Sequence, residues 1–572
     1  MSSHFLFHSA VSETIPFTAK YAFPTQASRV IQSTVKIPPR TTTQMGSSAA
    51  PLTSSAKGRL IQITLPSQGY LNPLESYLRF DLYLTSNSGT VQVAAPRILN
   101  SVHSMFRRLR VLYGSMVLED IQLYNALVRT LTDVAVGERY QTNVGAITEG
   151  MGSDAARAAL FNPLSRGVAK GASNPGYDGN LTNQTFAAPD AATGSSAHIY
   201  VQPSGPVAIL TSTALTSSNQ VKHTFTISLC SGLLTQQKLI PLKWLANQLT
   251  IELELEEPAG FIVTGSTAEV PTTLGVQTQS GTTPYGVTPL TGTPTWPALS
   301  TEVVPATYTA VAAVSSNPVS LTADSAAATM ANLAYYLDNI YYVANILEFD
   351  STYDAAFYQG MATGGVPIKF ASWHTHQHVP FGTNSILTIQ ERARSVKSAF
   401  TILRKRNDLV PSNTGAFLSD PYWTYPGVYS NTPNNTQWTD TANGIDEFQF
   451  RIGGRYFPSQ PVKCLYGAAE PLTELQKALN VMGDYQLAAP VKPETWWRPR
   501  GICVMGIEFE STNGLEMSGI NAEELADLAL IVKLVSGTGT SSGFDSDMYF
   551  TTFVHFDAMI IIRPNNVVEL IQ

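Results

Sequence analysis

Charged side chains are scarce in this 572-residue sequence, at 13% of the chain, whereas soluble proteins typically carry about 25%. The formal net charge is only -7, so the chain lacks the overall basic surface that nucleic-acid binding favours. Apolar residues make up 44% of the chain, which excludes wholly disordered behaviour. This composition favours a protein with a substantial core and a surface engaged by other subunits.

Cysteine is rare as well, since Cys230, Cys464 and Cys503 are the three in the chain. Cys230 and Cys503 fall within apolar strand patterns, so we interpret them as small buried residues and not as redox or metal sites. This usage fits assembly in a reducing compartment. Residues 1–17 lack the pattern of a secretory signal, and no apolar run approaches the ~20 residues that a membrane-spanning helix needs.

Short catalytic motifs are missing too: the sequence has no Walker phosphate loop, no HExxH pair and no CxxC pair. These motifs are the most direct signs of nucleotide, zinc or thiol chemistry. We therefore predict no catalytic residue, no cofactor and no metal ion, and we interpret the chain as a non-enzyme.

Alternation of apolar and polar residues is what the sequence has in abundance. After an expected turn at residues 69–73, Leu78, Phe80, Leu82 and Leu84 alternate with more polar neighbours, the two-residue period of a half-buried strand. Helical spacing of apolar residues is confined to short segments, chiefly 121–134 and 470–482. Helices do not alternate with strands, which disfavours a parallel α/β fold.

One order of elements occurs twice. Residues 225–255 and 505–535 each contain an alternating strand, a small-residue turn, a polar stretch and a second strand, and a long aromatic strand follows each. A strand, glycine turn, strand and helix also recur, at 106–134 and 448–482. Repetition of a whole element order indicates a duplicated unit. About eight short strands per unit predict an all-β chain of two tandem antiparallel jelly rolls, with short end helices and long loop insertions.

The duplication divides the chain into four predicted parts. The first is an N-terminal arm without sustained period, in which four basic residues face one acid, Glu13; we interpret it as a solvated tail. The parts are the arm (1–56), a first jelly roll (57–350, with loop insertions at about 136–218 and 257–333), a linker helix (351–365) and a second jelly roll (366–572, with a loop insertion at about 405–445).

The most suggestive polar cluster is WHTHQH, where His374, His376 and His378 would share one face of a strand. Such a face could present imidazoles to a metal ion, but a metal would need a further ligand and supporting contacts. We therefore interpret the histidines as a polar strand face at a subunit or loop contact, and leave ion binding open.

Other charged groups have simple structural interpretations. Each set could bind an ion, phosphate or ligand, but each fits a solvated strand face, a salt-bridge face or a turn. The sets are Glu391, Arg392, Arg394 and Lys397 (a solvated or intersubunit salt-bridge face); Glu252, Glu254 and Glu256 (the outer side of a strand); Arg107, Arg108 and Arg110 (an edge-strand device); and Asp545 and Asp547 (a turn).

Predicted loops hold the remaining candidates. Asn180, Asn183 and Asn434 begin N-x-T glycosylation triplets, whose use the missing secretory signal argues against. Four loop tryptophans could stack on sugars, or could cap cores and interfaces; they are Trp423, Trp438, Trp496 and Trp497.

Several segments resemble the double jelly-roll major capsid proteins of icosahedral double-stranded DNA viruses, most closely those of polinton-like viruses and virophages. The similar segments in the first half are 66–82, 106–131 and 238–258, and those in the second half are 348–361, 389–404, 447–462 and 475–481. The likeness covers roughly residues 58–135, 221–258 and 336–563. It carries no catalytic or ligand-binding residues.

The resemblance implies a structural protein that self-assembles as a homotrimer, a pseudo-hexagonal capsomer of six jelly rolls. Its expected location is the virion shell, assembled inside the infected host cell, and its expected partners are neighbouring capsomers, with penton and minor capsid proteins reached through the N-terminal arm. No specific nucleic-acid binding is expected. Two alternatives stay open: a glycan-binding or attachment β-sandwich protein, and a minor capsid or spike protein.

Overall fold

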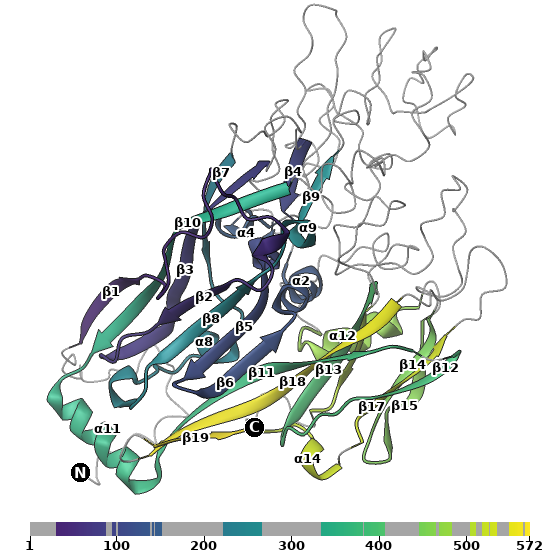
Figure 1. Cartoon of the computed structure of the whole chain (residues 1–572). Helices are drawn as coiled ribbons and strands as arrows, with labels where there is room; N and C mark the ends of the chain where they lie inside the picture. Colours follow the sequence, from purple (N-terminus) through teal and green to yellow (C-terminus); the bar gives the residue numbers. More distant parts are fainter. Residues whose placement is uncertain are drawn as a thin grey trace, which may run out of the picture.

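The computed structural model describes residues 30–86, 94–98, 101–137, 140–141, 144–151, 221–265, 333–380, 382–405, 445–464, 468–482, 504–510, 517–525, 527–534, 548–563 and 567–572. These residues form two antiparallel β-sandwiches, one from each half of the chain, which lie side by side (Figure 1). The prediction of an all-β chain with two tandem jelly rolls is confirmed.

Two four-stranded sheets form the first jelly roll, with strand orders β1-β10-β3-β7 and β2-β8-β5-β6. A ribbon of two further strands, β4 and β9, extends it. The bounds are β1 (Ile31–Ile37), β2 (Leu60–Thr64), β3 (Tyr70–Ser86), β4 (Ala94–Ile98), β5 (Phe106–Tyr113), β6 (Met116–Gln122), β7 (Val221–Ile227), β8 (Leu249–Leu255), β9 (Ile262–Gly265) and β10 (Leu333–Glu348).

The second jelly roll also has two sheets, with strand orders β11-β18-β13-β16 and β12-β17-β14-β15, and β19 pairs with β18. Its strands are β11 (Val366–His378), β12 (Asn384–Thr388), β13 (Val396–Lys405), β14 (Ile445–Ile452), β15 (Arg455–Lys463), β16 (Val504–Glu508), β17 (Ala529–Leu534), β18 (Met548–Arg563) and β19 (Val567–Ile571).

Both jelly rolls follow one topology. When the eight main strands of each are counted in chain order, one sheet takes the first, eighth, third and sixth, and the other takes the second, seventh, fourth and fifth. The segments 225–255 and 505–535 fall on the sixth and seventh strands, as the duplication requires. The repeat seen in the sequence therefore reflects two structurally equivalent units.

Three longer helices lie close to where the sequence predicts them: α2 (Tyr124–Ala135), α11 (Ser351–Gly364) and α12 (Glu470–Ala478). Asp350 caps α11 by accepting a hydrogen bond from the Tyr353 backbone N–H at 3.0 Å, and Gly365 ends it with a φ of 88°. No helix in the described part of the chain is long and apolar enough to span a membrane. The short helices are η2 (Ser54–Ala56), η3 (Val102–Met105), α4 (Val144–Thr148), α8 (Gly232–Thr235), η4 (Leu242–Trp244), α9 (Pro258–Phe261) and α14 (Ala522–Leu525).

The buried apolar side chains of both jelly rolls form a single contiguous cluster. In the first jelly roll Phe80 packs edge-to-face on Phe106, with ring centroids 5.9 Å apart. In the second, Phe400 packs on Trp373 at 5.3 Å. Each fully buried ring contributes roughly 1.5–3 kcal/mol through its removal from water. Because the core is continuous, the two jelly rolls form one packed body.

Three sequence-based expectations need correction. Residues 31–37 are not part of an arm, because they form β1 and pair with β10; six of the seven are exposed, so no apolar alternation marks this strand. The turn expected at 69–73 ends earlier, since Pro73 lies inside β3 and only Gly69 has a left-handed φ, 61°. The segments expected as long loops also contain α4, α9 and β9 at their ends.

Candidate functional site

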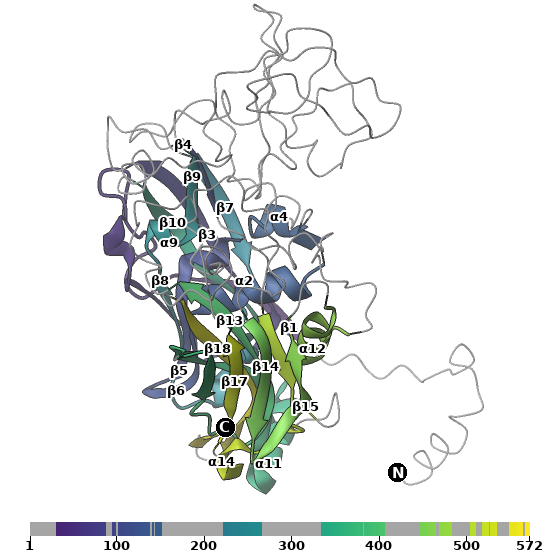
Figure 2. The same cartoon turned by 90° about the vertical axis from the view of Figure 1, so that its right-hand side faces the viewer.

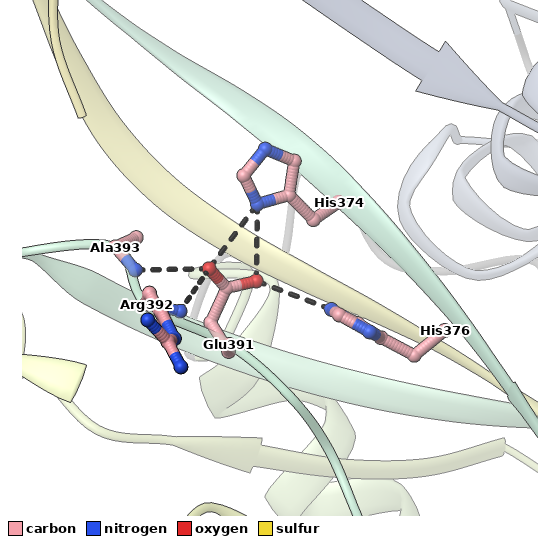
Figure 3. A network of polar contacts seen from close by, with 5 residues as sticks. All are labelled: His374, His376, Glu391, Arg392 and Ala393. Atoms are coloured by element: carbon pink, nitrogen blue, oxygen red, sulfur yellow. Dashed lines mark hydrogen bonds and ion pairs between the residues drawn. The ribbon is translucent and has the colours of Figure 1, made fainter. Parts of the chain in front are cut away.

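The predicted histidine cluster lies in the C-terminal half of β11, and two of its rings converge on one carboxylate (Figure 3). His374 Nδ1 and His376 Nε2 lie 3.0 Å and 3.2 Å from Glu391 Oε2. The other oxygen, Oε1, accepts hydrogen bonds from the backbone N–H groups of Arg392 at 2.8 Å and Ala393 at 2.9 Å. This cluster fastens the segment between β12 and β13 to β11.

Glu391 is not on a solvated face as expected, because its side chain is only 2% exposed. Burial by itself raises the pKa of a carboxyl group, but here the hydrogen bonds from His374, His376 and the Ala393 N–H outweigh it. The pKa of Glu391 therefore lies well below its ordinary value. The group is a stable buried anion that holds two imidazoles in place.

His378 does not join this cluster. Its Nε2 is buried without a hydrogen-bond partner among the described residues, and burial lowers its pKa, with a smaller effect from His376. In the described ranges, no group of three His, Cys, Asp or Glu side chains has an arrangement that could hold a metal ion. The arrangement of His374 and His376 instead suits fixing a strand.

A second buried carboxylate, Glu119 on β6, lies where the two jelly rolls meet. Its Oε1 accepts hydrogen bonds from the Ser372 hydroxyl at 2.7 Å and from the Gly232 N–H at 2.8 Å. Its Oε2 accepts from the Ser231 hydroxyl. Figure 1 shows β6 and β11 crossing close together at this place. We call the contacts of β6 and α8 with β11 the joint.

The start of α8 is built for this close approach. Ser231 caps the helix by accepting a hydrogen bond from the Leu234 N–H at 3.2 Å. A Cβ atom on Gly232 would lie 1.7 Å from the Ala371 carbonyl oxygen, so only glycine permits this contact. Burial raises the pKa of Glu119, because its donors are hydroxyl and N–H groups rather than cations.

One further hydrogen bond crosses the joint, and another connects β6 with the residue that follows β19. The Thr375 hydroxyl donates to the Gln122 carbonyl at 2.8 Å, and the Gln572 amide donates to the Leu118 carbonyl at 3.4 Å. The sequence gives no distinct signal for the joint, since Glu119 is one of two adjacent acids in β6. It gives no sign of the partners, because they come from other segments of the chain.

The helix between the jelly rolls is fastened separately. Asp354 on α11 accepts a hydrogen bond from the Tyr70 hydroxyl at 3.0 Å and forms an ion pair with Lys243. The Trp244 indole N–H donates to the same hydroxyl at 2.9 Å. Burial raises the pKa of Tyr70, so its hydroxyl remains a donor. The connection between the two jelly rolls is therefore fixed to the first one.

The arginines predicted at a strand edge lie on β5, which is an inner strand between β8 and β6, so that expectation is wrong. Arg108 binds Asp120, with its Nε 2.7 Å from the carboxylate, and Arg110 lies 2.6 Å from Glu252. Glu252 and Glu256 are buried, so the expectation that they lie on an outer strand face is wrong for these two. These groups stabilise the sheet through cross-strand pairs.

The basic residues near Glu391 also have partners within the chain. Arg394 Nε lies 2.8 Å from Glu523, and Lys397 lies within 3.8 Å of Asp557 and 3.6 Å of Glu510. These pairs form inside one chain, without the neighbouring subunit that was one expectation for this face.

Of the cysteines, Cys464 is buried and Cys230 is partly buried, and neither forms a disulfide. Burial raises the pKa of the Cys230 thiol to about 12, which fits the interpretation of an inert residue. The remaining candidates lie outside the described residues: Cys503, Asn180, Asn183, Asn434, Asp545, Asp547, Trp423, Trp438, Trp496 and Trp497.

Solved structures are similar to this chain. The Faustovirus major capsid protein is similar with a TM-score of 0.50 at 10% identity, covering 96% of this chain and 93% of that chain. The Sputnik virophage structure gives 0.44 at 10% identity over 98% and 91%, and the mavirus major capsid protein gives 0.39 at 9% identity over 99% and 94%. No protein-family model and no curated protein matches the sequence. The chain has the double jelly-roll fold.

Proposed function

We propose that this chain is the major structural subunit of an icosahedral viral shell, acting by self-assembly and not by catalysis. The carrying observation is the duplication: two jelly rolls of identical strand order stand side by side in one packed body. Three such chains supply six similar units, which can surround a hexagonal position in a lattice. The likeness in fold to the Faustovirus major capsid protein supports this proposal.

The contacts between the two jelly rolls support a structural role for the paired units. The contiguous apolar core and the hydrogen bonds to the buried Glu119 hold the two jelly rolls together. In a shell subunit the two jelly rolls need fixed relative positions, because the edges of each subunit must fit those of its neighbours. The low charge content, 13%, is also suited to a surface that is largely covered by neighbouring subunits.

The proposal extends to the partners. The trimer forms through large obligate interfaces, which commonly bury about 2,000 Å² or more, and capsomers meet through smaller contacts. Residues 1–29, which precede β1, bind penton or minor capsid proteins. The protein resides in the virion after assembly inside the infected cell.

Light scattering coupled to size-exclusion chromatography tests this function. The expected mass is about 185 kDa, three times the 61.8 kDa of one chain, and negative-stain images should show particles with a hexagonal outline. A protein that remains monomeric at micromolar concentration would contradict the proposal. Abundance in purified particles separates a major from a minor capsid protein, because the major subunit dominates the protein content.

A further inference from the structure

The joint covers one edge of each unit and leaves the equivalent edges bare. In the first jelly roll, β6 is the fifth main strand, and Leu118, Glu119 and Ile121 on it are buried. Its equivalent in the second jelly roll is β15, where Val462 alone among nine residues is buried. Likewise β11 is mostly covered, whereas its equivalent, β1, exposes six of its seven residues. Each chain thus exposes, on β1 and on β15, the two surfaces that correspond to those covered in the joint.

These exposed edges lie on opposite sides of the folded molecule. Figure 1 shows β1 on the outer side of the first jelly roll and β15 on the far side of the second. In Figure 2, turned so that this far side faces the viewer, β14, β15 and β17 are in front. A contact between β1 of one chain and β15 of another is therefore head-to-tail, the kind of contact that can close into a ring.

The strand register places particular residues opposite one another. Ile37 pairs with Tyr342 of β10, and Ala371 pairs with Asp557 of β18. Counted back from the ends of β10 and β18, these are equivalent positions, so Ile37 stands in β1 where Ala371 stands in β11. In the joint, Ala371 meets Gly232, the first residue of α8. The first residue of the equivalent helix, α14, is Ala522. Ala522 is buried and carries a Cβ, so a contact between chains would be made by the exposed residues that follow it and not by a second glycine contact.

The charges at these two positions are complementary. Lys36, beside Ile37, is exposed and makes no ion pair within the described part of the chain. Glu523 and Glu524 follow Ala522 on α14 and are exposed. Glu523 already binds Arg394, whereas Glu524 makes no ion pair among the described residues. Since the exposed charges of β15, Arg455 and Lys463, are basic, the acidic part of this face is α14.

We propose that the β1 edge of one chain binds the α14–β15 face of a second copy of this chain, through surfaces equivalent to those that meet in the joint, with Lys36 facing Glu524. This inference rests on the proposed function, which it deepens by naming the surfaces that form the trimer. Each chain gives its β1 edge to one neighbour and its α14–β15 face to the other.

Charge reversal in the full-length chain tests the pairing. Lys36→Glu and Glu524→Lys each place like charges together, so each should raise the dissociation constant of the assembly at least tenfold in native mass spectrometry or light scattering over a concentration series. The double variant should recover most of the wild-type affinity. Glu470→Lys is the control, because Glu470 is exposed on α12, and neither α12 nor its equivalent α2 takes part in the joint.

Cross-linking gives an independent readout. A Lys36→Cys/Glu524→Cys variant should form covalent oligomers on a non-reducing gel, up to the three-chain species, and each single cysteine variant should not. If the Lys36→Glu and Glu524→Lys variants assemble as well as the Glu470→Lys control, this inference is overturned and the proposed function stays intact. Failure of the double variant to recover would also overturn it. A wild-type chain that stays monomeric would instead contradict the proposed function.

Discussion

The Glu119 carboxylate on β6 accepts a hydrogen bond of 2.7 Å from the Ser372 hydroxyl on β11, and this contact connects the two jelly rolls through a buried acid. The same carboxylate also accepts hydrogen bonds from the Gly232 N–H and the Ser231 hydroxyl at the start of α8. One side chain therefore satisfies three donors from two separate segments, β11 and the start of α8. Its loss would leave all of these donors unsatisfied in a buried place.

Replacement of Glu119 should weaken the joint more than replacement of any single donor. Glu119→Ala is expected to lower the free energy of unfolding by at least about 3 kcal/mol, because each buried donor left unpaired costs about 1–3 kcal/mol. Ser372→Ala should cost only about 1 kcal/mol, since it removes one donor and leaves the carboxylate its others. Urea titration monitored by tryptophan fluorescence measures both. Equal losses of unfolding free energy in the two variants would contradict the prediction that Glu119 contributes more than any single donor.

The close approach of α8 to β11 predicts a strong effect of one added methyl group. Gly232→Ala would place a Cβ 1.7 Å from the Ala371 carbonyl oxygen, so the joint must open or the strand must shift. We expect a loss of several degrees in the melting temperature and faster proteolysis between the jelly rolls.

A matched glycine provides the control. A Cβ on Gly360, in the exposed part of α11, would meet no atom within 4 Å. Gly360→Ala should therefore stabilise the helix by roughly 0.5–1 kcal/mol through helix propensity. If the two variants melt alike, the contact between Gly232 and Ala371 does not constrain the joint.

Much of the fold could be predicted because each jelly roll repeats a local pattern. Alternation marks strands such as β3 and β8, and glycine turns mark hairpins such as that of β5 and β6, so the same order could be found twice. β1 could not be found in this way. Its residues face outward at the edge of the sheet, so burial imposes no alternation on them, and only pairing with β10 defines the strand.

The candidate site was less predictable, because its partners are distant in the chain. The three histidines could be placed on one strand, but their carboxylate, Glu391, comes from the segment between β12 and β13. In the joint, Glu119 and Ser372 are 253 positions apart. Such contacts depend on how sheets pack, which single-sequence periodicity does not encode.

The connection through α11 predicts a further effect on stability. Asp354→Ala would remove the partner of both the Tyr70 hydroxyl and Lys243. We expect a loss of about 1–3 kcal/mol in the free energy of unfolding, the cost of leaving such groups unpaired. Gln359→Ala on the same helix should change stability by no more than about 0.5 kcal/mol, because this side chain is exposed. Similar losses for both variants would argue against the role of Asp354.

Acid sensitivity should depend on Glu391. Because its pKa in the folded chain lies below the ordinary value of 4.5, the unfolded chain takes up a proton first as the pH falls. The stability that this carboxylate contributes is therefore fully present above about pH 5 and is lost progressively as the pH falls below 4.5 toward the folded-state pKa. Glu391→Gln should be less stable at neutral pH, and its stability should change less over this acid range. Chemical denaturation at pH values from 3 to 7 would measure both slopes, and parallel curves for the two proteins would show that the cluster is not linked to folding.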